Sequence, residues 1–155
     1  LEDNPNLHFL LIGGGAMKES LLKLKDELGC TNVTMLDSVM KEEVARYISI
    51  LDVCLINLKK SPLFTTVIPS KIFENAGMGI PILMGVEGEA KDIISQYGAG
   101  LCFEPENFDD FRQKLTALLE PATYAKCKEG CRHLADNFDR KLLAANMLKV
   151  IESAK

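Results

Sequence analysis

Short apolar segments alternate with helix-like segments along most of the chain, and this order restricts the folds that the chain can adopt. Each apolar segment has five to seven residues and is bounded by glycine, proline or polar residues, as is typical of strands in a parallel sheet covered on both faces. We expect strands at 7–13, 31–36, 51–57, 80–84 and 99–103. Strands that alternate with helices form a Rossmann-like, doubly wound parallel sheet with helices on both faces, which binds ligands beyond the carboxyl ends of its strands.

The remaining segments have the apolar spacing of amphipathic helices. In the first of them, Leu21, Leu24 and Leu28 recur at helical spacing among charged residues, and Gly29 follows as a stop signal. Helices are expected at 16–29, 41–49, 70–78, 89–98, 107–120 and 121–138. A last helix begins at Asp139 and is expected to pack five apolar side chains: Leu142, Leu143, Met147, Val150 and Ile151. The chain therefore ends in a helical tail that follows the sheet.

The composition is that of an ordinary globular domain and excludes several other classes of protein. Hydrophobic residues make up 47% of the 155 residues and charged residues 26%. No segment has the composition of a linker, so residues 1–155 are expected to form one domain. The formal charge of -4 argues against a nucleic-acid partner, because binding to a phosphate backbone needs clustered Lys and Arg. No apolar run reaches the roughly 20 residues of a membrane span.

Two features indicate where the protein resides and how much of it is present. The number of cysteines is five, which is odd, and several lie in apolar segments, so we expect reduced, buried thiols and a cytoplasmic location. The first six residues, LEDNPN, resemble the end of a helix and a loop that lead directly into the first strand. The chain is therefore expected to be a fragment of a longer protein.

The first loop that could carry chemistry is GGGAMK, residues 13–18. Its glycines let the backbone approach a ligand closely, and the helix that follows offers free N–H groups to an anion. The loop departs from the dinucleotide-binding fingerprint, because Lys18 stands where that pattern needs glycine, and Asp37 is only the nearest candidate for the ribose-binding acid. The loop is either an anion site or simply a tight turn between a strand and a helix.

The second loop is LDSVMKEE, residues 36–43. Ser38 suits the turn before the next helix, and Glu42 and Glu43 fall in the first turn of that helix, where acids complement the helix dipole. These roles are structural. The position of the loop is informative, because the backbone near Val39 would lie at the same edge of the sheet as the glycine loop.

The third loop, VIPSKIFE, runs into the helix expected at 70–78. A capping box that starts at Ser70 would need its acid at position 73, but that residue is Phe73 and the carboxylate belongs to Glu74. Helical spacing places Ile72, Phe73 and Ala76 on one side of the helix. The opposite side carries Ser70, Lys71, Glu74, Gly77 and Met78.

The polar side of this helix has two interpretations. A carboxylate such as Glu74 can accept hydrogen bonds from the vicinal hydroxyls of a ribose, while Ser70, Lys71 and the free helix N–H groups suit a diphosphate. These groups occur together in a nucleotide. The alternative is a surface ion pair between Lys71 and Glu74, which contributes only a few tenths of a kcal/mol, about 0.3.

Other residues that could carry chemistry are better explained by structure. The acids of FDDF, residues 108–111, suit the first turn of a helix rather than a metal site. Cys127 and Cys131 lie one helical turn apart without a second pair that would complete a zinc site. His8 and His133 stand alone, so no nucleophile–base arrangement is indicated.

With these residues in view, nearly the whole chain resembles the C-terminal, donor-binding domain of a GT-B glycosyltransferase of group 1, the GT4-like family. The segment from FLLIGGGAMKES to LDVCLI resembles that family's strand, glycine loop, second strand, base-contacting turn and third strand. The motifs VIPSKIFENAGMGIPIL, EGEAKDII and YGAGLCFEPEN continue the pattern in order. The ordered set is more specific than any one of the motifs.

The resemblance implies a nucleotide-sugar site built from all three loops. Gly13, Gly14 and Gly15 would line the donor cleft together with Lys18, and the backbone of Val39 and Met40 would hold the nucleobase. Pro69, Ser70 and Lys71 would hold the diphosphate, and Glu74 the ribose hydroxyls, so that Lys71 and Glu74 are the catalytic candidates. Thr66 stands where many relatives carry a second glutamate, eight residues before Glu74.

The resemblance also implies the reaction and the partners of the complete enzyme. A sugar would be transferred from a nucleotide-diphosphate sugar, such as a UDP-sugar, to an acceptor, with retention at the anomeric carbon and without a metal or another cofactor. The acceptor, a carbohydrate or a lipid-linked sugar as in polysaccharide biosynthesis, would bind through an N-terminal domain that this sequence lacks. The full-length enzyme could then associate with a membrane surface, whereas this fragment alone should be inactive.

Two other functions remain open from the residues alone. One is half of a nucleotide-sugar epimerase, which would have a similar site but would need acid–base residues that are not visible here. The other is a non-catalytic nucleotide-binding or regulatory module. Glu74 distinguishes a binding site from a structural role, because only a binding role makes nucleotide affinity depend on its carboxylate.

Overall fold

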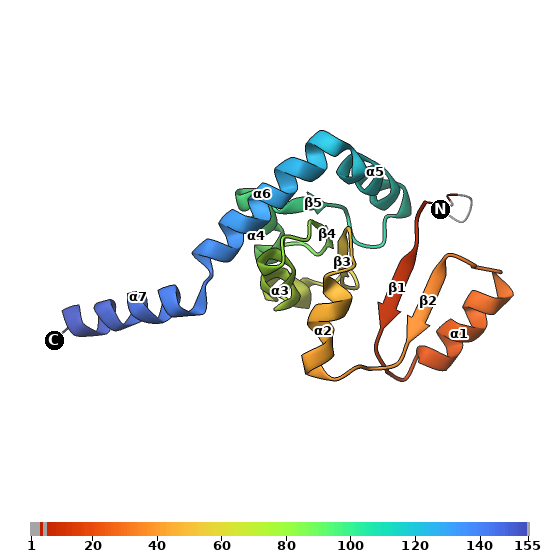
Figure 1. The fold of residues 1–155 in the computed structure, drawn as a ribbon, viewed down its shortest axis with the longest axis horizontal. Coiled ribbons are helices and arrows are strands. Elements are labelled where there is room, and N and C mark those ends of the chain that lie inside the picture. Colours follow the sequence, from red (N-terminus) through yellow and green to blue (C-terminus); the bar gives the residue numbers. More distant parts are fainter. Residues whose placement is uncertain (1–3, 5, 155) are drawn as a thin grey trace. The chain divides into compact units, whose positions relative to one another are not determined.

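The computed structural model describes residue 4 and residues 6–154, so most of the N-terminal segment interpreted as the end of a preceding helix lies outside the described residues. The contacts of the chain group into two compact units, residues 1–47 and 48–155 (Figure 1). That residues 1–155 form a single domain stays a prediction.

The first unit is a strand–helix–strand unit followed by a second helix. Its elements are β1 (Phe9–Ile12), α1 (Lys18–Glu27), β2 (Val33–Leu36) and α2 (Lys41–Ile48). β1 and β2 pair in parallel, with Phe9 opposite Val33 and Ile12 opposite Leu36. The parallel arrangement expected from the sequence is confirmed for these two strands, and α1 is the crossover that such a pair requires.

Burial in the first unit is lower than the sequence suggested. β1 was expected to be covered on both faces, but Leu11 and Ile12 are exposed. The leucines of α1 that recur at helical spacing, Leu21, Leu24 and Leu28, are exposed as well. The periodicity therefore predicted the helix correctly, and a sheet of two strands offers too little apolar surface to cover a complete helix stripe.

The second unit contains three further strands and most of the helices. Its elements are β3 (Cys54–Asn57), the 3-10 helix η1 (Pro62–Thr66), α3 (Lys71–Gly77), β4 (Ile82–Gly85), α4 (Glu89–Tyr97), β5 (Gly100–Cys102), α5 (Phe108–Leu119), α6 (Pro121–Asn137) and α7 (Arg140–Ser153). The strands form a parallel sheet in the order β3-β4-β5. The doubly wound α/β class and the helical tail are thus confirmed.

β4 is the centre of this unit. All four of its residues are buried, as expected of a strand with a neighbour on each side. Ile82 and Met84 pack into one cluster with buried side chains of α3, α4 and α6, among them Ile72, Ile94 and Leu134. α5 contacts β4 and β5 as well, and Phe111 of α5 packs edge-to-face on Phe103 with ring centroids 5.2 Å apart.

β3 differs from the buried strand that the sequence suggested. The strand is shorter than expected, and its residues alternate, with Cys54 and Ile56 buried but Leu55 and Asn57 exposed. β3 lies at the end of the three-stranded group, and the alternation of buried and exposed residues indicates that one of its faces is covered. The apolar run of β3 therefore contains more apolar residues than are buried at this position in the sheet.

The expected packing of the last helix is wrong. α7 is present, but the five apolar side chains that it was predicted to pack are 45–67% exposed. Figure 1 shows α7 continuing away from the end of α6 rather than lying along it. The apolar spacing identified the helix, whereas burial depends on a partner surface that no neighbouring element of this unit provides.

The cysteines are all free thiols, and three of them are buried: Cys54, Cys127 and Cys131. The Cys131 thiol donates to the backbone carbonyls of Ile80 and Ala99, at 3.4 and 3.3 Å. Burial raises the pKa of Cys54 to about 11 and that of Cys131 to about 12. Both thiols are therefore neutral at physiological pH and behave as small apolar core residues.

Two helical glycines give a matched test of the packing of α6. A Cβ at Gly130 would lie 2.3 Å from the carbonyl oxygen of Gly98, whereas a Cβ at Gly77 in α3 would meet nothing within 4 Å. We expect Gly130→Ala to lower the free energy of unfolding by about 2 kcal/mol, because overpacking costs more than helix propensity returns. Gly77→Ala should raise it by up to about 1 kcal/mol. Urea unfolding of both variants measures the difference, and equal stabilisation by the two alanines would contradict the close approach of α6 to Gly98.

Candidate functional site

The polar side of α3 is where the sequence predicted it. Ile72 and Ala76 are buried and Phe73 is half-buried, with its ring 4.7 Å from the ring of Phe138. The residues expected on the other side are all exposed: Ser70, Lys71, Glu74, Gly77 and Met78. The core contacts of α3 therefore fix which of its side chains are available to a ligand.

The start of α3 has unused hydrogen-bonding groups. Ser70 occupies the N-cap position, but its side chain makes no capping bond, which confirms that the simple capping explanation fails. Its carbonyl accepts from the amides of Phe73 and Glu74, at 3.0 and 3.3 Å. Among the described residues, no hydrogen bond uses the N–H groups of Ser70 or Lys71. Two amides and a hydroxyl are therefore available within two residues.

Lys71 and Glu74 do not form an ion pair with each other in the part of the chain that the structure describes. The explanation of these two residues without a ligand therefore lacks its contact. α3 has only seven residues, so its dipole is small and the positive charge at this position comes mainly from Lys71. The ammonium and the carboxylate are each free to contact a ligand group of opposite character.

Asn75 is the buried polar residue of α3, and its burial was not predicted from the sequence. Its side chain is 3% exposed and its Nδ2 donates to the carbonyl of Lys71 at 2.8 Å. Its Oδ1 has no partner among the described residues. The bond to Lys71 ties the first turn of α3 to the helix interior.

The glycine loop of the first unit is open to solvent on one side. A Cβ at Gly13 or Gly15 would meet nothing within 4 Å, and Gly13 has φ +154°, which L side chains rarely adopt. A Cβ at Gly14 would lie 3.3 Å from the Ser38 hydroxyl oxygen. The loop after β1 and the loop after β2 are thus neighbours, as the parallel pairing predicted.

Lys18 and Asp37 join these two loops. The Lys18 ammonium donates to Asp37 Oδ1, and this contact, as a hydrogen bond and as a charge pair, holds the pKa of Asp37 below its ordinary value. Asp37 is the first residue after β2. The nearest candidate for a ribose-binding acid is therefore held at the strand end by a lysine from the glycine loop.

The turn that leads into α2 is capped by Glu43. Ser38 lies in the turn before α2, as expected, and Met40 directly precedes the helix: its amide donates to Glu43 Oε2 at 3.3 Å and its carbonyl accepts from the Glu43 amide at 2.9 Å. This is the carboxylate half of a capping box. Met40 is exposed, and its neighbour Val39 is half-buried.

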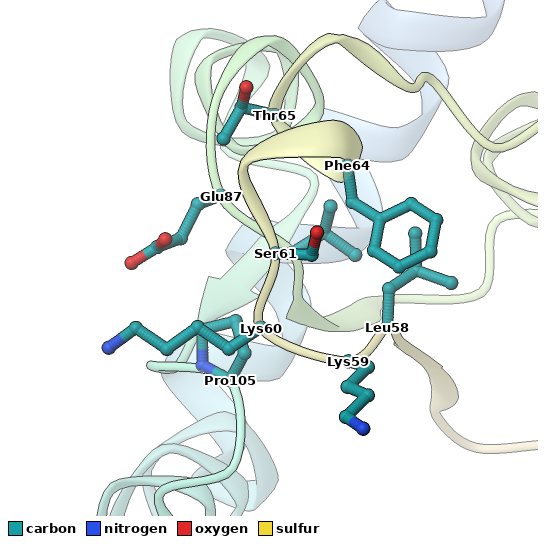
Figure 2. Close-up of a pocket in the computed structure, with 9 residues that line it drawn as sticks. Leu58, Lys59, Lys60, Ser61, Phe64, Thr65, Glu87 and Pro105 are labelled. Carbon is teal, nitrogen blue, oxygen red and sulfur yellow. The ribbon is translucent and has the colours of Figure 1, made fainter.

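The carboxyl end of the three-stranded sheet carries a second group of polar side chains. Figure 2 shows the residues that line a pocket here, among them Lys60 and Ser61 of the loop after β3 with Glu87 and Pro105 of the loops after β4 and β5. A hollow of about 420 Å³ adjoins it, lined by Lys60 and residues 104–109. Thr66, at the end of η1, is exposed.

η1 was not predicted, although Ser61 and Pro62 are a recognisable start signal. The Ser61 hydroxyl accepts from the Leu63 amide at 3.3 Å, and proline occupies the first turn. η1 presses against the start of α4, since a Cβ at Gly88 would lie 1.9 Å from the Thr65 carbonyl oxygen. This contact fixes the position of Thr66 relative to the sheet.

The predicted site residues therefore divide between the two units. The first unit holds Gly13, Gly14, Gly15, Lys18, Val39 and Met40, and the second holds Thr66, Pro69, Ser70, Lys71 and Glu74. Within each unit they lie on neighbouring loops or on one helix turn. That the two groups meet around one ligand stays a prediction.

A metal site and a membrane-spanning helix are both absent from the part of the chain that the structure describes. No group of three or more potential metal-ligating side chains occurs among residue 4 and residues 6–154. No helix of the same residues is long and apolar enough to span a membrane.

The sequence profile of one protein family, described as "Glycosyl transferases group 1", matches residues 1–134. The chain belongs to this family. The match covers every predicted site residue and both units, and it ends within α6. The predicted resemblance to the donor-binding half of a group 1 GT-B glycosyltransferase is thereby confirmed.

Solved glycosyltransferase structures share the fold. HepE from Anabaena, in complex with UDP-glucose, aligns with a TM-score of 0.78 at 16% identity over 97% of this chain and 42% of its own. A glycosyltransferase from Rickettsia africae aligns with a TM-score of 0.74 at 18% identity over 96% of this chain and 40% of its own. Sucrose-phosphate synthase from Thermosynechococcus elongatus aligns with a TM-score of 0.71 at 19% identity over 94% of this chain and 38% of its own.

This group 1 chain thus spans about two fifths of the length of the structures that it matches. No curated protein matches it in a sequence comparison.

The pair of Lys60 and Glu104 was also missed by the sequence analysis, because its members lie in different loops. Lys60 Nζ donates to Glu104 Oε1 at 2.7 Å, and Asn107 Nδ2 donates to Glu104 Oε2 at 3.0 Å. The hydrogen bond from Lys60 lowers the pKa of Glu104 most, and the hydrogen bond from Asn107 lowers it further. Glu104 in turn raises the pKa of Lys60. The pair links the loops after β3 and β5 across the end of the sheet.

These pKa shifts predict a pH-dependent contribution to stability. Because the pKa of Glu104 is lower in the folded chain than in the unfolded chain, its carboxylate stabilises the fold above the ordinary carboxyl pKa, and the effect is lost as the pH falls through the folded value. We expect Glu104→Gln to lower Tm by roughly 1–2 °C near neutral pH and the difference to shrink as the pH falls below the ordinary carboxyl pKa. Glu89→Gln, an exposed acid without an ion pair among the described residues, is the control. A Tm difference for Glu104→Gln that does not shrink with falling pH would refute this assignment.

Proposed function

We propose that the chain is the donor-binding half of an enzyme that transfers a sugar from a nucleotide-diphosphate sugar to an acceptor. The observation that carries the proposal is the exposed, unpaired set at the start of α3, namely Ser70, Lys71 and Glu74, in a chain of the group 1 glycosyltransferase family. A structural explanation would have these groups bonded to the protein. They are instead free for a ligand.

Each group suits one part of the donor. The Ser70 hydroxyl and the two free amides can donate to diphosphate oxygens, and the Lys71 ammonium can neutralise the charge that develops on the leaving diphosphate. The Glu74 carboxylate can accept from two ribose hydroxyls. Pro69 sets the turn before Ser70, and Thr66 would lie near the sugar. These residues would do in this half what a bound metal does in other transferases.

The glycine loop and the turn after β2 would complete the site. Gly13, Gly14 and Gly15 allow the ligand to approach the backbone, and open space lies over Gly13 and Gly15. The nucleobase would lie against the backbone of Val39 and Met40. A structure of HepE contains UDP-glucose, which supports a UDP-sugar as the donor.

In the complete enzyme, the bond between the anomeric carbon and the diphosphate breaks, and the acceptor hydroxyl oxygen forms a new bond to that carbon and loses its proton. The resemblance to the family supports retention of configuration and catalysis without a metal or another cofactor. The acceptor, a carbohydrate or a lipid-linked sugar, would bind through another part of a longer enzyme. The free, buried thiols fit a cytoplasmic enzyme that approaches the membrane peripherally when its acceptor is lipid-linked.

Calorimetric titration of UDP into this chain and into Glu74→Ala tests the proposal. Loss of a charged acceptor should weaken UDP binding by roughly 10- to 100-fold, because hydrogen bonds to charged groups contribute about 1.5–3 kcal/mol. Tm should change little, because Glu74 is exposed and unpaired.

The matched control is Glu89→Ala, which removes another exposed acid from the first turn of a helix in the same unit. It should bind UDP like the wild type. Equal affinities for all three proteins would show that Glu74 is a surface acid and that the chain is not a donor site of the proposed kind.

A further inference from the structure

The ion pair of Lys18 and Asp37 places two opposite charges at the end of β2. The Lys18 side chain is only 20% exposed, whereas that of Asp37 is 96% exposed. Lys18 is therefore largely enclosed and contacts one carboxylate oxygen, Oδ1. The second oxygen of Asp37 has no partner among the hydrogen bonds of the described residues and faces solvent.

This pair lies in the turn that would hold the nucleobase. Asp37 is two residues before Val39, and the neighbouring Ser38 hydroxyl lies against Gly14 of the glycine loop. The amide and the carbonyl of Met40 are already bonded to Glu43. The side chains of Asp37 and Lys18 are a charged acceptor and a charged donor at the start of this turn.

The four nucleobases differ in the hydrogen-bonding groups that their edges present to such a pair. Uracil and guanine each carry a ring N–H beside a carbonyl, so a carboxylate can accept from the N–H while an ammonium donates to the carbonyl. Cytosine and adenine carry an unprotonated ring nitrogen at the corresponding position. A fixed carboxylate would face that lone pair, and two acceptors that face each other form no hydrogen bond, so the complementary base is favoured.

We infer that Lys18 and Asp37 form a specificity-determining pair that selects donors with uracil or guanine over donors with cytosine or adenine. The inference rests on the proposed function, because it assumes that the base lies against Val39. Lys18 acts by fixing the carboxylate and by donating to the base carbonyl, and Asp37 accepts from the ring N–H.

A purely structural role for the pair makes a different prediction. The pair would then only connect the start of α1 to the end of β2, and an ion pair whose carboxylate is solvated contributes little to stability. Its removal would change Tm slightly and would alter the affinities for all nucleotides by the same factor or not at all.

The experiment is calorimetric titration of UDP, GDP, CDP and ADP into the wild type, Asp37→Asn and Lys18→Met at one salt concentration. The wild type should bind UDP or GDP at least about 10-fold tighter than CDP and ADP. Asp37→Asn should reduce that ratio by about 10-fold, because an amide can donate to the ring nitrogen of cytosine or adenine. Lys18→Met should reduce it in the same direction.

The matched control is Glu27→Gln, which removes another exposed ion pair of the first unit, that of Lys23 and Glu27 at 3.7 Å. It should leave all four affinities unchanged, and thermal melting of each variant shows that it is folded. If the wild type binds UDP and loses it in Glu74→Ala, but Asp37→Asn keeps the wild-type ratio of UDP to CDP affinity, the inference is wrong and the proposed function stands. If the wild type binds none of the four nucleotides, the proposed function and the inference both fail.

Discussion

The burial of β4 between its two neighbouring strands is the constraint on which the rest of the second unit depends. All of its residues are buried, and Ile82 and Met84 form the surface on which α3 packs through Ile72 and Ala76. Once these contacts are made, helical geometry leaves Ser70, Lys71 and Glu74 on the opposite side of α3. The candidate site is thus a consequence of core packing rather than of any bond among its own residues.

The same packing explains why the site can be polar and unsatisfied without destabilising the chain. Exposed groups remain hydrated when no ligand is bound, so an unused amide, hydroxyl, ammonium and carboxylate cost little at the surface. The buried polar group of α3 is different. Asn75 has its Oδ1 without a partner among the described residues, and an unmet buried acceptor costs about 1–3 kcal/mol. Its Nδ2 restrains the carbonyl of Lys71, at the turn that presents the free groups.

Much of the fold could be predicted from the sequence because strands, helices and their order follow from local periodicity. The two sides of α3 were assigned correctly for the same reason, since Ile72 and Ala76 are one turn apart and both apolar. Burial was predicted less well: the leucines of α1, the end of β1 and the apolar residues of α7 are exposed. Whether an apolar stripe is covered depends on the area of the surface opposite it, which no local pattern encodes. The pairs of Lys18 with Asp37 and of Lys60 with Glu104 were missed because their members are 19 and 44 residues apart.

The proposed function requires that the glycine loop, the turn after β2 and the start of α3 all respond to the same nucleotide. The most direct test is to record amide NMR spectra of the isotopically labelled chain during a titration with UDP. We expect the amides of three segments to shift together and to fit a single dissociation constant: Gly13–Gly15, Val39 with Met40, and Ser70–Glu74. Shifts confined to one of the two units, or centred on residues outside these loops, would contradict it.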